Sequence, residues 1–417
     1  MKVLEIINII IGIVFLLCYS YQFLYIPISV FARQKKHKDE VLHKIGILIA
    51  ARNEEAVMGN LIDSIKSQNY PSELIDIYVC ADNCTDRTAK IAAEHGADVF
   101  ERFNKEKIGK GYVLNFMLNE LEKSGDKHDA YIVLDADNIL DPNFIKEINR
   151  TYCDGYKIVT CYRNSKNYGD NWVSAGMGLW FLREARYLNA ARFAIGSSCA
   201  VSGTGFLVSA DILKNRGGWN YFTLTEDIEF TIDNITRKEK IGYAKDAILY
   251  DEQPTKFRQS WRQRVRWTRG YFQVFRKHGK DLINGIFHGS FSCFDMTMNI
   301  MPAAIISGLS VVVNIIAIIV TIITFGPITQ LLQIIFSSFC TLYLATFIVG
   351  FITVLTEGKN IHTSLFKKIF YTFTFPLFML TFIPVSIGAF FSKSEWKPIV
   401  HDKVITLDEI KKQDSEE

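Results

Sequence analysis

Cysteine pairs typical of metal sites are absent from this sequence. None of its eight cysteines forms a Cys-x-x-Cys pair, and the nearest approach is Cys80 with Cys84. Structural zinc sites usually show such spaced pairs, so the pattern argues against one. Most of these cysteines lie in a segment expected to be cytoplasmic, where thiols stay reduced, and we therefore expect free cysteines.

A large net charge is also missing. Lysine and arginine number 47 against 44 aspartates and glutamates, which leaves a formal net charge of +3 at pH 7. So small an excess gives no global argument for a nucleic-acid partner, and we predict none; the informative charge is local. The apolar residues, 49% of the chain, are concentrated in a few long runs.

The first apolar run, residues 4–31, carries a single charge at Glu5. As a helix it is long enough to cross a hydrocarbon layer of ~30 Å. It lacks the basic start and the small-residue cleavage site of a signal peptide, so we expect it to be retained. The basic stretch RQKKHK at 33–38 follows at once. Short basic flanks stay in the cytoplasm, which places the next segment there.

Three further apolar runs cover about 298–325, 329–357 and 368–391, and Pro376 and Pro384 interrupt the last one. If all three cross the membrane, the carboxyl tail lies outside; a broken or re-entrant last run would keep the tail in the cytoplasm. Segments 176–186 and 283–297 mix aromatic with charged residues, are too short to span, and are candidates for interfacial helices. The predicted organisation is an N-terminal transmembrane helix (1–35), a cytoplasmic domain (40–255), basic, aromatic and interfacial helices (256–297), a transmembrane bundle (298–395) and a polar tail (396–417).

In the cytoplasmic domain, short apolar runs alternate with a helical pattern. The runs are IGILIA (45–50), LIDIYVC (74–80), AYIVLD (130–135) and KIVTCY (157–162), and apolar residues at helical spacing occur between the first two, within 54–68. Such alternation predicts an α/β fold with a mostly parallel sheet flanked by helices. Ligands of these sheets bind outside the carboxyl ends of the strands, so the chemistry is expected there.

Three of these strand ends run into polar groups: ARNEE at 51–55, Asp82 with Asn83, and Asp135 with Asp137. Each stretch alone fits an ordinary turn, in which Asx side chains bond the nearby backbone. Three such ends in one crevice instead indicate a site. Two carboxylates two residues apart at a strand end are suitable ligands for Mg²⁺ or Mn²⁺, with positions left open for phosphate oxygens.

The acidic stretch TLTEDIEF at 223–230 has two interpretations. Thr223 with Glu226 fits the S/T-x-x-E capping box, and acids suit the first turn of a helix. Alternatively, one of the two acids, Glu226 or Asp227, is held there to accept a proton. The stretch alone does not separate these interpretations.

Residues 256–277 contain eight lysines or arginines and six aromatic residues. One interpretation is an interfacial helix, with aromatics among the headgroups and arginines toward anionic lipid. Stacking on nucleic-acid bases is a second, which a membrane-fixed chain of low charge disfavours. In a helix, however, Gln263, Arg266 and Trp267 share one face. An amide, a guanidinium and an indole together suit a diphosphate and a sugar ring, because arginine binds phosphate oxygens bidentately.

Taken in order, these motifs resemble the membrane-bound processive glycosyltransferases of family 2, which include hyaluronan, chitin, cellulose and poly-N-acetylglucosamine synthases. The resemblance covers about residues 45–270 and the flanking membrane segments. It rests on Asn53-Glu54, Asp82, Lys110, Asp135-x-Asp137, Thr225-Glu226-Asp227 and Gln263-Arg264-Val265-Arg266-Trp267. It implies a GT-A fold, a UDP-sugar donor, Mg²⁺ or Mn²⁺, and inversion at the anomeric carbon.

The resemblance also implies a role for each matching residue. Donor binding is expected from Ala51, Glu54, Asp82, Lys110, Asp135 and Asp137, with the metal on Asp135 and Asp137, and Asp227 is the expected general base. The diphosphate and acceptor are expected to contact Gly203, Thr204, Glu226, Gln263, Arg264, Arg266 and Trp267.

Some positions depart from the family pattern. Ala50 and Arg52 stand where many relatives have a proline and an aromatic residue, and Ile399 replaces the threonine of a motif at Trp396–His401 that closes over the donor in some relatives.

The function expected from this resemblance is a multi-pass enzyme of the cell membrane that extends a β-linked polysaccharide and exports it. Its donor would be UDP-N-acetylglucosamine, because a single span before the domain resembles the poly-N-acetylglucosamine synthases. The alternative is a non-processive transferase that glycosylates a lipid carrier or glycolipid. A nucleotide-regulated channel or transporter is a third possibility. The sequence argues against it, because ionisable residues such as Asp295 and Glu357 occur only near the edges of the apolar runs, whereas a path for ions or solutes usually carries them inside the membrane.

Overall fold

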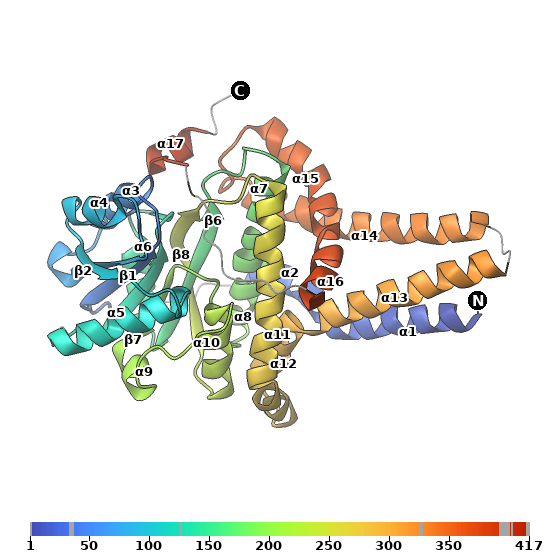
Figure 1. Cartoon of the computed structure of the whole chain (residues 1–417), viewed down its shortest axis with the longest axis horizontal. Helices are drawn as coiled ribbons and strands as arrows, with labels where there is room; N and C mark the ends of the chain where they lie inside the picture. Colours follow the sequence, from blue (N-terminus) through green and yellow to red (C-terminus); the bar gives the residue numbers. More distant parts are fainter. Residues whose placement is uncertain are drawn as a thin grey trace.

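The computed structural model describes residues 2–32, 37–125, 127–324, 328–391, 401 and 403–413. It consists of an α/β domain from which long apolar helices extend on one side (Figure 1). All eight cysteines are free thiols, as expected.

The domain is built on one eight-stranded sheet of order β3-β2-β1-β4-β7-β6-β8-β5. The predicted parallel arrangement holds for β3-β2-β1-β4 and for β6 with β8, whereas β7 runs antiparallel to β4 and β6, and β5 antiparallel to β8. The sheet is therefore mixed. Its strands are β1 Ile45–Ala51, β2 Ile75–Asp82, β3 Asp98–Arg102, β4 Ala130–Asp135, β5 Ile139–Leu140, β6 Ile158–Ser165, β7 Phe206–Ser209 and β8 Ile241–Asp251.

Two apolar layers cover the two faces of the sheet, because successive side chains of a strand point to opposite faces. In β4, Ile132 and Leu134 belong to the layer under α3 and α6, whereas Tyr131 and Val133 face α5 and α7. The helices of the domain are α3 Met58–Lys66, α4 Thr88–Glu94, α5 Lys110–Ser124, α6 Phe144–Cys153, α7 Trp172–Arg183, α8 Ala190–Ala194, α9 Ala210–Asn215 and α10 Glu226–Thr236, with a short 3₁₀ turn η1 Ser72–Leu74 and a π-helical turn η2 Glu184–Asn189.

The helix predicted at 176–186 forms, as the end of α7 and the start of η2. Most side chains of α7 are buried, and Gly176 lies against the ring of Phe378, so the helix is enclosed between the sheet and the apolar helix α15 (Leu365–Leu380). The other predicted interfacial segment, 283–297, forms the end of α11 (Phe257–Phe287) and most of α12 (Phe291–Ile300).

Among the residues that the structure describes, three helical segments are long and apolar enough to cross a membrane: Ile6–Phe31, Ile335–Glu357 and Leu365–Phe391; a shorter apolar helix covers Gly308–Ile323. The last run is broken at Thr381, between α15 Leu365–Leu380 and α16 Phe382–Phe391. The remaining helices are α1 Lys2–Tyr19, α2 Tyr21–Phe31, α13 Pro302–Ile323, α14 Ile328–Glu357 and α17 Leu407–Lys412. After the break, Ile405 and Ile410 pack on Ile139 and Tyr250, so this part of the tail lies on the α/β domain.

One buried ion pair joins three parts of the chain. Arg192 of α8 donates from Nε to Asp295 Oδ2 of α12 at 2.5 Å, and Tyr21 of α2 donates to Asp295 Oδ1 at 2.6 Å. Both charged side chains are completely inaccessible to solvent. The pair therefore fixes the N-terminal apolar helix and α12 to the domain.

Removing one partner of this pair should be costly. We expect Asp295→Ala to lower the free energy of unfolding by about 3–5 kcal/mol, since it leaves the Arg192 charge buried without a counter-charge. Chemical unfolding in detergent measures this loss, and Glu94→Ala at the exposed Lys90–Glu94 pair is the matched control, with an expected change below about 1 kcal/mol. Equal effects of the two substitutions would contradict the assignment.

Candidate active site

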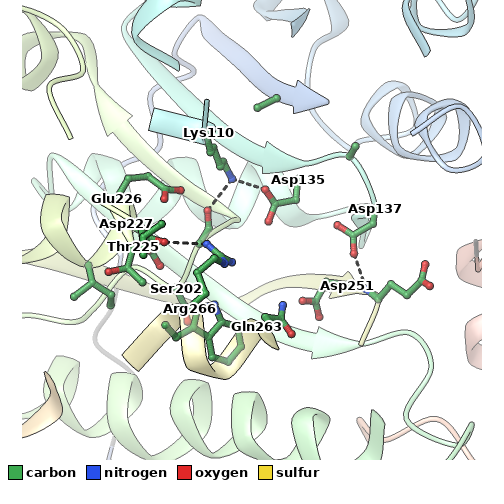
Figure 2. Close-up of a pocket in the computed structure, with 18 of the residues that line it drawn as sticks. Lys110, Asp135, Asp137, Ser202, Thr225, Glu226, Asp227, Asp251, Gln263 and Arg266 are labelled. Atoms are coloured by element: carbon green, nitrogen blue, oxygen red, sulfur yellow. Dashed lines mark hydrogen bonds and ion pairs between the residues drawn. The ribbon is translucent and has the colours of Figure 1, made fainter. Parts of the chain in front are cut away.

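A pocket of about 240 Å³ lies between the carboxyl ends of β1, β2 and β4 and the N-terminal half of α11 (Figure 2). The sequence-predicted residues that line it are Ala51, Glu54, Asp82, Lys110, Asp135, Asp137, Gly203, Glu226, Asp227, Gln263, Arg266 and Trp267. Residues separated by more than 200 positions thus meet in one cavity.

Thr204 and Arg264 were also predicted to contact ligand, but the structure places both outside this lining. The Thr204 hydroxyl accepts from the backbone N–H of Asp135 at 2.9 Å, and so holds the end of β4 in place. Arg264 is buried, donates to the Thr381 hydroxyl at 2.6 Å and lies over the ring of Phe378 at 4.5 Å. Its guanidinium therefore contacts the rings of Phe378 and Phe382 and the Thr381 hydroxyl, where α15 meets α16, and burial lowers its pKa to about 10.

One end of the pocket is formed by Asp82 and the Asp-x-Asp motif. The carboxylate of Asp82 is buried and paired with Arg102 Nη1 at 2.5 Å. Lys110 Nζ donates to Asp135 Oδ1 at 2.5 Å and to the carbonyl oxygen of Gly203 at 2.9 Å. Lys110 thus connects the end of β4 with the loop before β7, and its charge faces the cavity.

Asp137 is buried and ionised. Its Oδ2 accepts from the backbone N–H of Glu252 at 2.8 Å. Burial alone would raise the pKa of Asp137, but the charges of His401 and Lys166 outweigh it, and the pKa is lowered. The carboxylate is therefore available to a cation at neutral pH.

The residues present suit a divalent cation that binds together with a diphosphate. Among the described residues, no three His, Cys, Asp or Glu side chains form a ready-made metal cluster. Asp135 and Asp137 nevertheless offer hard oxygen ligands, and Mg²⁺ typically takes one or two carboxylates and completes its shell with water and phosphate oxygens. The donor set thus fits Mg²⁺ or Mn²⁺ and does not resemble a structural zinc site.

The acidic pair of TLTEDIEF opens α10. The helix begins at Glu226 with Thr225 as N-cap, and no side-chain capping bond is made by Thr225. The predicted capping box of Thr223 with Glu226 is therefore wrong. The backbone N–H groups of Phe222 and Thr223 instead donate to Oε2 of Glu229, at 3.1 and 2.9 Å, so a carboxylate inside the helix holds the preceding loop.

Glu226 and Asp227 are half-buried, and their surroundings favour a bound proton. Burial and the neighbouring Asp227 carboxylate raise the pKa of Glu226 to about 7, and burial also raises the pKa of Asp227. Lys110 and Arg266 act against these shifts by stabilising the ionised forms. A carboxylate with a raised pKa at a cavity wall is the kind of group that serves as a general base.

Helix α11 forms the wall of the pocket opposite the strand ends. Its Gly270 lies against Thr225, where a Cβ would come within 2.5 Å of the hydroxyl oxygen, so this close contact of α10 and α11 requires glycine. Arg266 Nη1 donates to the carbonyl oxygen of Leu224 at 2.9 Å, and the ring of Trp267 meets Phe181 edge-on with centroids 5.9 Å apart. The predicted face of Gln263, Arg266 and Trp267 therefore points into the cavity.

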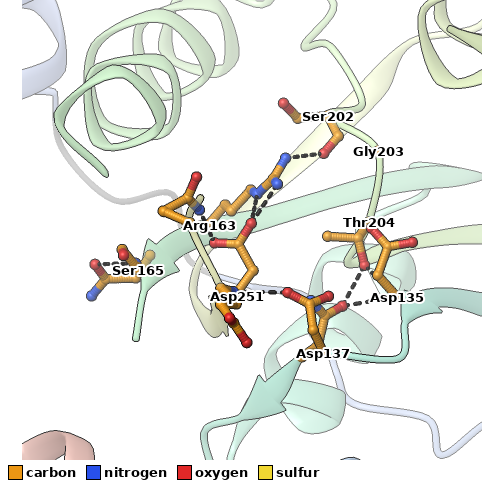
Figure 3. Close-up of polar contacts among 12 residues, drawn as sticks. Asp135, Asp137, Arg163, Ser165, Ser202, Gly203, Thr204 and Asp251 are labelled. Atoms are coloured by element: carbon orange, nitrogen blue, oxygen red, sulfur yellow. Dashed lines mark hydrogen bonds and ion pairs between the residues drawn. The ribbon is translucent and has the colours of Figure 1, made fainter. Parts of the chain in front are cut away.

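Several pocket residues had no role in the sequence-based prediction: Arg163, Trp180, Phe181, Glu184, Asp251, Glu252 and Tyr271. Arg163, at the end of β6, donates to Asp251 Oδ2 from Nε at 2.7 Å and to the carbonyl oxygen of Ser202 at 2.7 Å (Figure 3). Its guanidinium lies 3.6 Å above the Phe181 ring. Glu184 accepts from the Ser202 hydroxyl at 3.0 Å, and burial raises its pKa. Arg163 and Asp251 end neighbouring strands, which is the signal that could have found them.

The carboxyl tail reaches the pocket at His401. Its Nδ1 lies 3.0 Å from Glu54 Oε2, and His401 is part of the pocket wall. Burial would lower the pKa of His401, but the charges of Asp137, Glu54 and Glu252 raise it to about 10. The rest of the Trp396–His401 motif lies outside the described residues.

The fold and the pocket together define a glycosyltransferase of the GT-A class. The chain belongs to family 2 of these enzymes: the model of the family described as "Glycosyltransferase like family 2" matches residues 43–270. The solved structure of the mannosyltransferase PcManGT from Pyrobaculum calidifontis, in complex with GDP-Man and Mn²⁺, superposes over 94% of this chain and 100% of its own, with a TM-score of 0.62 and 13% identity. At that identity the likeness shows the fold alone.

Relatives named for two kinds of product match the chain. The β-monoglucosyldiacylglycerol synthase of Nostoc sp. is 28% identical over 300 residues, which cover 67% of this chain and 61% of that protein. The poly-β-1,6-N-acetyl-D-glucosamine synthase of Staphylococcus epidermidis is 22% identical over 240 residues, 57% of each chain. This chain spans about half to three fifths of the length of the curated relatives it matches.

Proposed function

We propose that this protein is an inverting glycosyltransferase that transfers a hexose from a UDP-sugar to a hydroxyl group of a membrane lipid. The observation that carries the proposal is the position of the acceptor end of the pocket. Trp180, on the pocket wall, stacks on Phe382 of α16 with ring centroids 4.9 Å apart. An acceptor held at the surface of the membrane would enter from this side.

The exposure of the apolar helices supports a lipid acceptor over an exported polymer. In the most apolar stretches of Ile6–Phe31 and Ile335–Glu357, only 6% and 11% of residues are buried within the protein. Helices that enclose a polysaccharide channel would bury one side against each other. In Figure 1, α13 and α14 extend away from the domain and come together at their far ends. Their exposed apolar side chains, such as Ile322 and Leu355, fit helices that mainly contact lipid. The β-monoglucosyldiacylglycerol synthases among the relatives agree with such an acceptor.

In the proposed reaction, the pocket residues accept a proton and stabilise the charge of the leaving group. As the acceptor hydroxyl attacks the anomeric carbon from the face opposite the leaving group, Asp227 accepts its proton. As the bond to UDP breaks, Arg266 and Lys110 stabilise the negative charge of the diphosphate. A single displacement needs one base and gives inversion. When bound, a divalent cation held by Asp135 and Asp137 would supply further positive charge to the diphosphate.

The glucosyldiacylglycerol relatives favour UDP-glucose as the donor, in place of the UDP-N-acetylglucosamine expected from the layout of the spans. Asp82, Ala51 and Glu54 would hold the nucleoside. The basic flank after the first span favours a cytoplasmic α/β domain, on the side where UDP-sugars are made. The tail docked on the domain agrees with a carboxyl end on the same side of the membrane.

The experiment uses the full-length protein in nanodiscs that contain diacylglycerol, incubated with radiolabelled UDP-glucose. We expect label in a lipid product that extracts into organic solvent, and no transfer when diacylglycerol is left out. UDP-N-acetylglucosamine and GDP-mannose are the parallel donors, and Asp227→Asn gives the background. UDP release without any labelled lipid would refute the proposed acceptor.

A processive polysaccharide synthase is the second candidate. The observation that favours it is the Gln263–Trp267 segment on the helix that leads into the membrane-side helices, together with the poly-N-acetylglucosamine synthase among the relatives. In the same assay it predicts water-soluble labelled polymer that grows with time and does not require diacylglycerol.

A further inference from the structure

Helix α11 carries a row of cations that the active site does not use. Arg258, Arg262, Arg269, Arg276 and Lys280 follow one another at intervals of four, seven, seven and four residues. With 3.6 residues per turn, these intervals place all five within about 40° around the helix axis. We call these five residues the basic stripe. From Arg258 to Lys280 it extends about 33 Å at 1.5 Å per residue.

The basic stripe is exposed and lacks counter-charges. Four of its five side chains are exposed, Arg269 is half-buried, and within the described part of the chain none of the five makes an ion pair or a hydrogen bond. The only acidic residue of α11, Asp281, lies about 100° or more away around the helix. Five cations side by side repel each other in water, so the row is tolerated most easily where anions neutralise it.

The other two faces of α11 fix the direction in which the stripe points. One face carries Gln263 and Trp267 in the pocket and Val274 in the apolar core. A second face carries Val265 and Phe272, which pack on Val385 and Phe390 of α16. The stripe lies next to this second face and opposite the first. It is therefore adjacent to the membrane-side helices and away from the domain core.

The orientation of α11 matches the plane of a membrane surface. In Figure 1, α11 runs across the direction in which α1, α13 and α14 extend, at the boundary between these helices and the α/β domain. If these helices cross the bilayer, α11 lies along its surface. Trp261, on the α16 side of α11, supplies an aromatic ring of the kind that favours this depth.

We propose that the basic stripe is a docking surface for the headgroups of anionic phospholipids. Guanidinium groups bind phosphate oxygens with two parallel hydrogen bonds, and basic side chains next to apolar helices are attracted to an anionic leaflet. Because Gln263, Arg266 and Trp267 belong to the same helix, headgroups bound along the stripe hold the acceptor end of the pocket at the membrane surface.

The test compares two triple variants in proteoliposomes of phosphatidylcholine with 20% phosphatidylglycerol. Arg258→Gln/Arg262→Gln/Arg276→Gln removes three charges from the stripe. Lys66→Gln/Lys105→Gln/Lys214→Gln removes three exposed charges from the far side of the domain and is the matched control. The measurement is the association of spin-labelled phosphatidylglycerol relative to spin-labelled phosphatidylcholine, by electron paramagnetic resonance.

For wild type and the control we expect a several-fold preference for phosphatidylglycerol, which the stripe variant lowers to near one. Each basic residue near an anionic surface contributes roughly a five-fold factor at most, and high salt should weaken the preference. If the stripe variant has the same circular dichroism spectrum as wild type, and the same turnover in pure phosphatidylcholine, then the variant is folded. A folded stripe variant that keeps the full preference would overturn the proposal, and so would an equal loss in the control. Neither result depends on which sugar or acceptor the enzyme uses.

Discussion

Replacing Asp227 by asparagine should lower turnover by roughly 10²–10⁴-fold, the usual contribution of a positioned general base. The amide keeps the size and position of the carboxylate at the start of α10 but cannot take the proton of the acceptor. Asp82, Asp135 and Asp137, which we propose bind the donor, lie elsewhere in the pocket and should be unaffected. We therefore expect kcat to fall while the Kd for UDP-glucose, measured by calorimetry, stays within about two-fold of wild type.

Glu226→Gln is the matched control, because it removes the adjacent carboxylate and leaves Asp227. The pH dependence separates the two residues. Wild-type turnover should fall on the acid side as Asp227, whose pKa burial raises above its ordinary value, becomes protonated. Glu226 ionises only as pH rises through about 7, and its added negative charge then alters the rate near neutrality. Glu226→Gln should keep the acid limb and lose the change near pH 7. An acid limb that disappears in Glu226→Gln would assign the base to Glu226 instead.

β1, β2 and β4 could be predicted from sequence because they are largely buried on both faces of the sheet. β3 also lies in this parallel part, but it is short and partly exposed and was not predicted. Continuous apolar runs such as those of β1 and β4 are then unavoidable, and they stand out against polar helices. β7 has four residues and follows a glycine-rich loop, and β5 has two, so neither shows a pattern long enough to detect. The antiparallel pairings that make the sheet mixed could therefore not be predicted from the sequence.

In the site, helical spacing was a better guide than the family motif. The face of Gln263, Arg266 and Trp267 follows from spacing, and the structure turns it into the pocket. Arg264 was included because of the resemblance, although it lies about 100° from Gln263 on the helix, and it contacts Thr381, between α15 and α16, instead. Extending the same face by one turn from Trp267 would have found Tyr271.

Contacts that depend on the tertiary fold could not be predicted. His401 approaches Glu54 only because the chain breaks at Thr381 and returns to the domain, and no local pattern specifies that return. The partner of Asp295 is likewise 103 residues away, at Arg192. The sequence shows that Asp295 lies at the edge of an apolar run. A carboxylate buried there needs a nearby cation, but the sequence does not show which residue supplies it.

Removing the divalent cation should reduce turnover nearly to background. We expect chelation by EDTA to abolish transfer and Mn²⁺ or Mg²⁺ to restore it, because the charge that develops on the diphosphate then lacks its main counter-charge. Asp137→Asn should lower kcat/KM by roughly 10²-fold or more, the scale for loss of one electrostatic contact to a developing charge. The lowered pKa of Asp137 keeps this carboxylate ionised at neutral pH, so the loss should persist across the neutral range.

Asp98→Asn, an exposed aspartate at the start of β3, is the matched control for this prediction and should leave turnover unchanged. A second measurement separates metal binding from folding. Electron paramagnetic resonance of Mn²⁺ titrated into the protein with UDP should show a bound fraction in wild type and in Asp98→Asn, and a much weaker one in Asp137→Asn. If Asp137→Asn binds Mn²⁺ as tightly as wild type, Asp137 is not a metal ligand. If EDTA leaves turnover intact, Lys110 and Arg266 alone neutralise the diphosphate, and the Asp-x-Asp motif has another role.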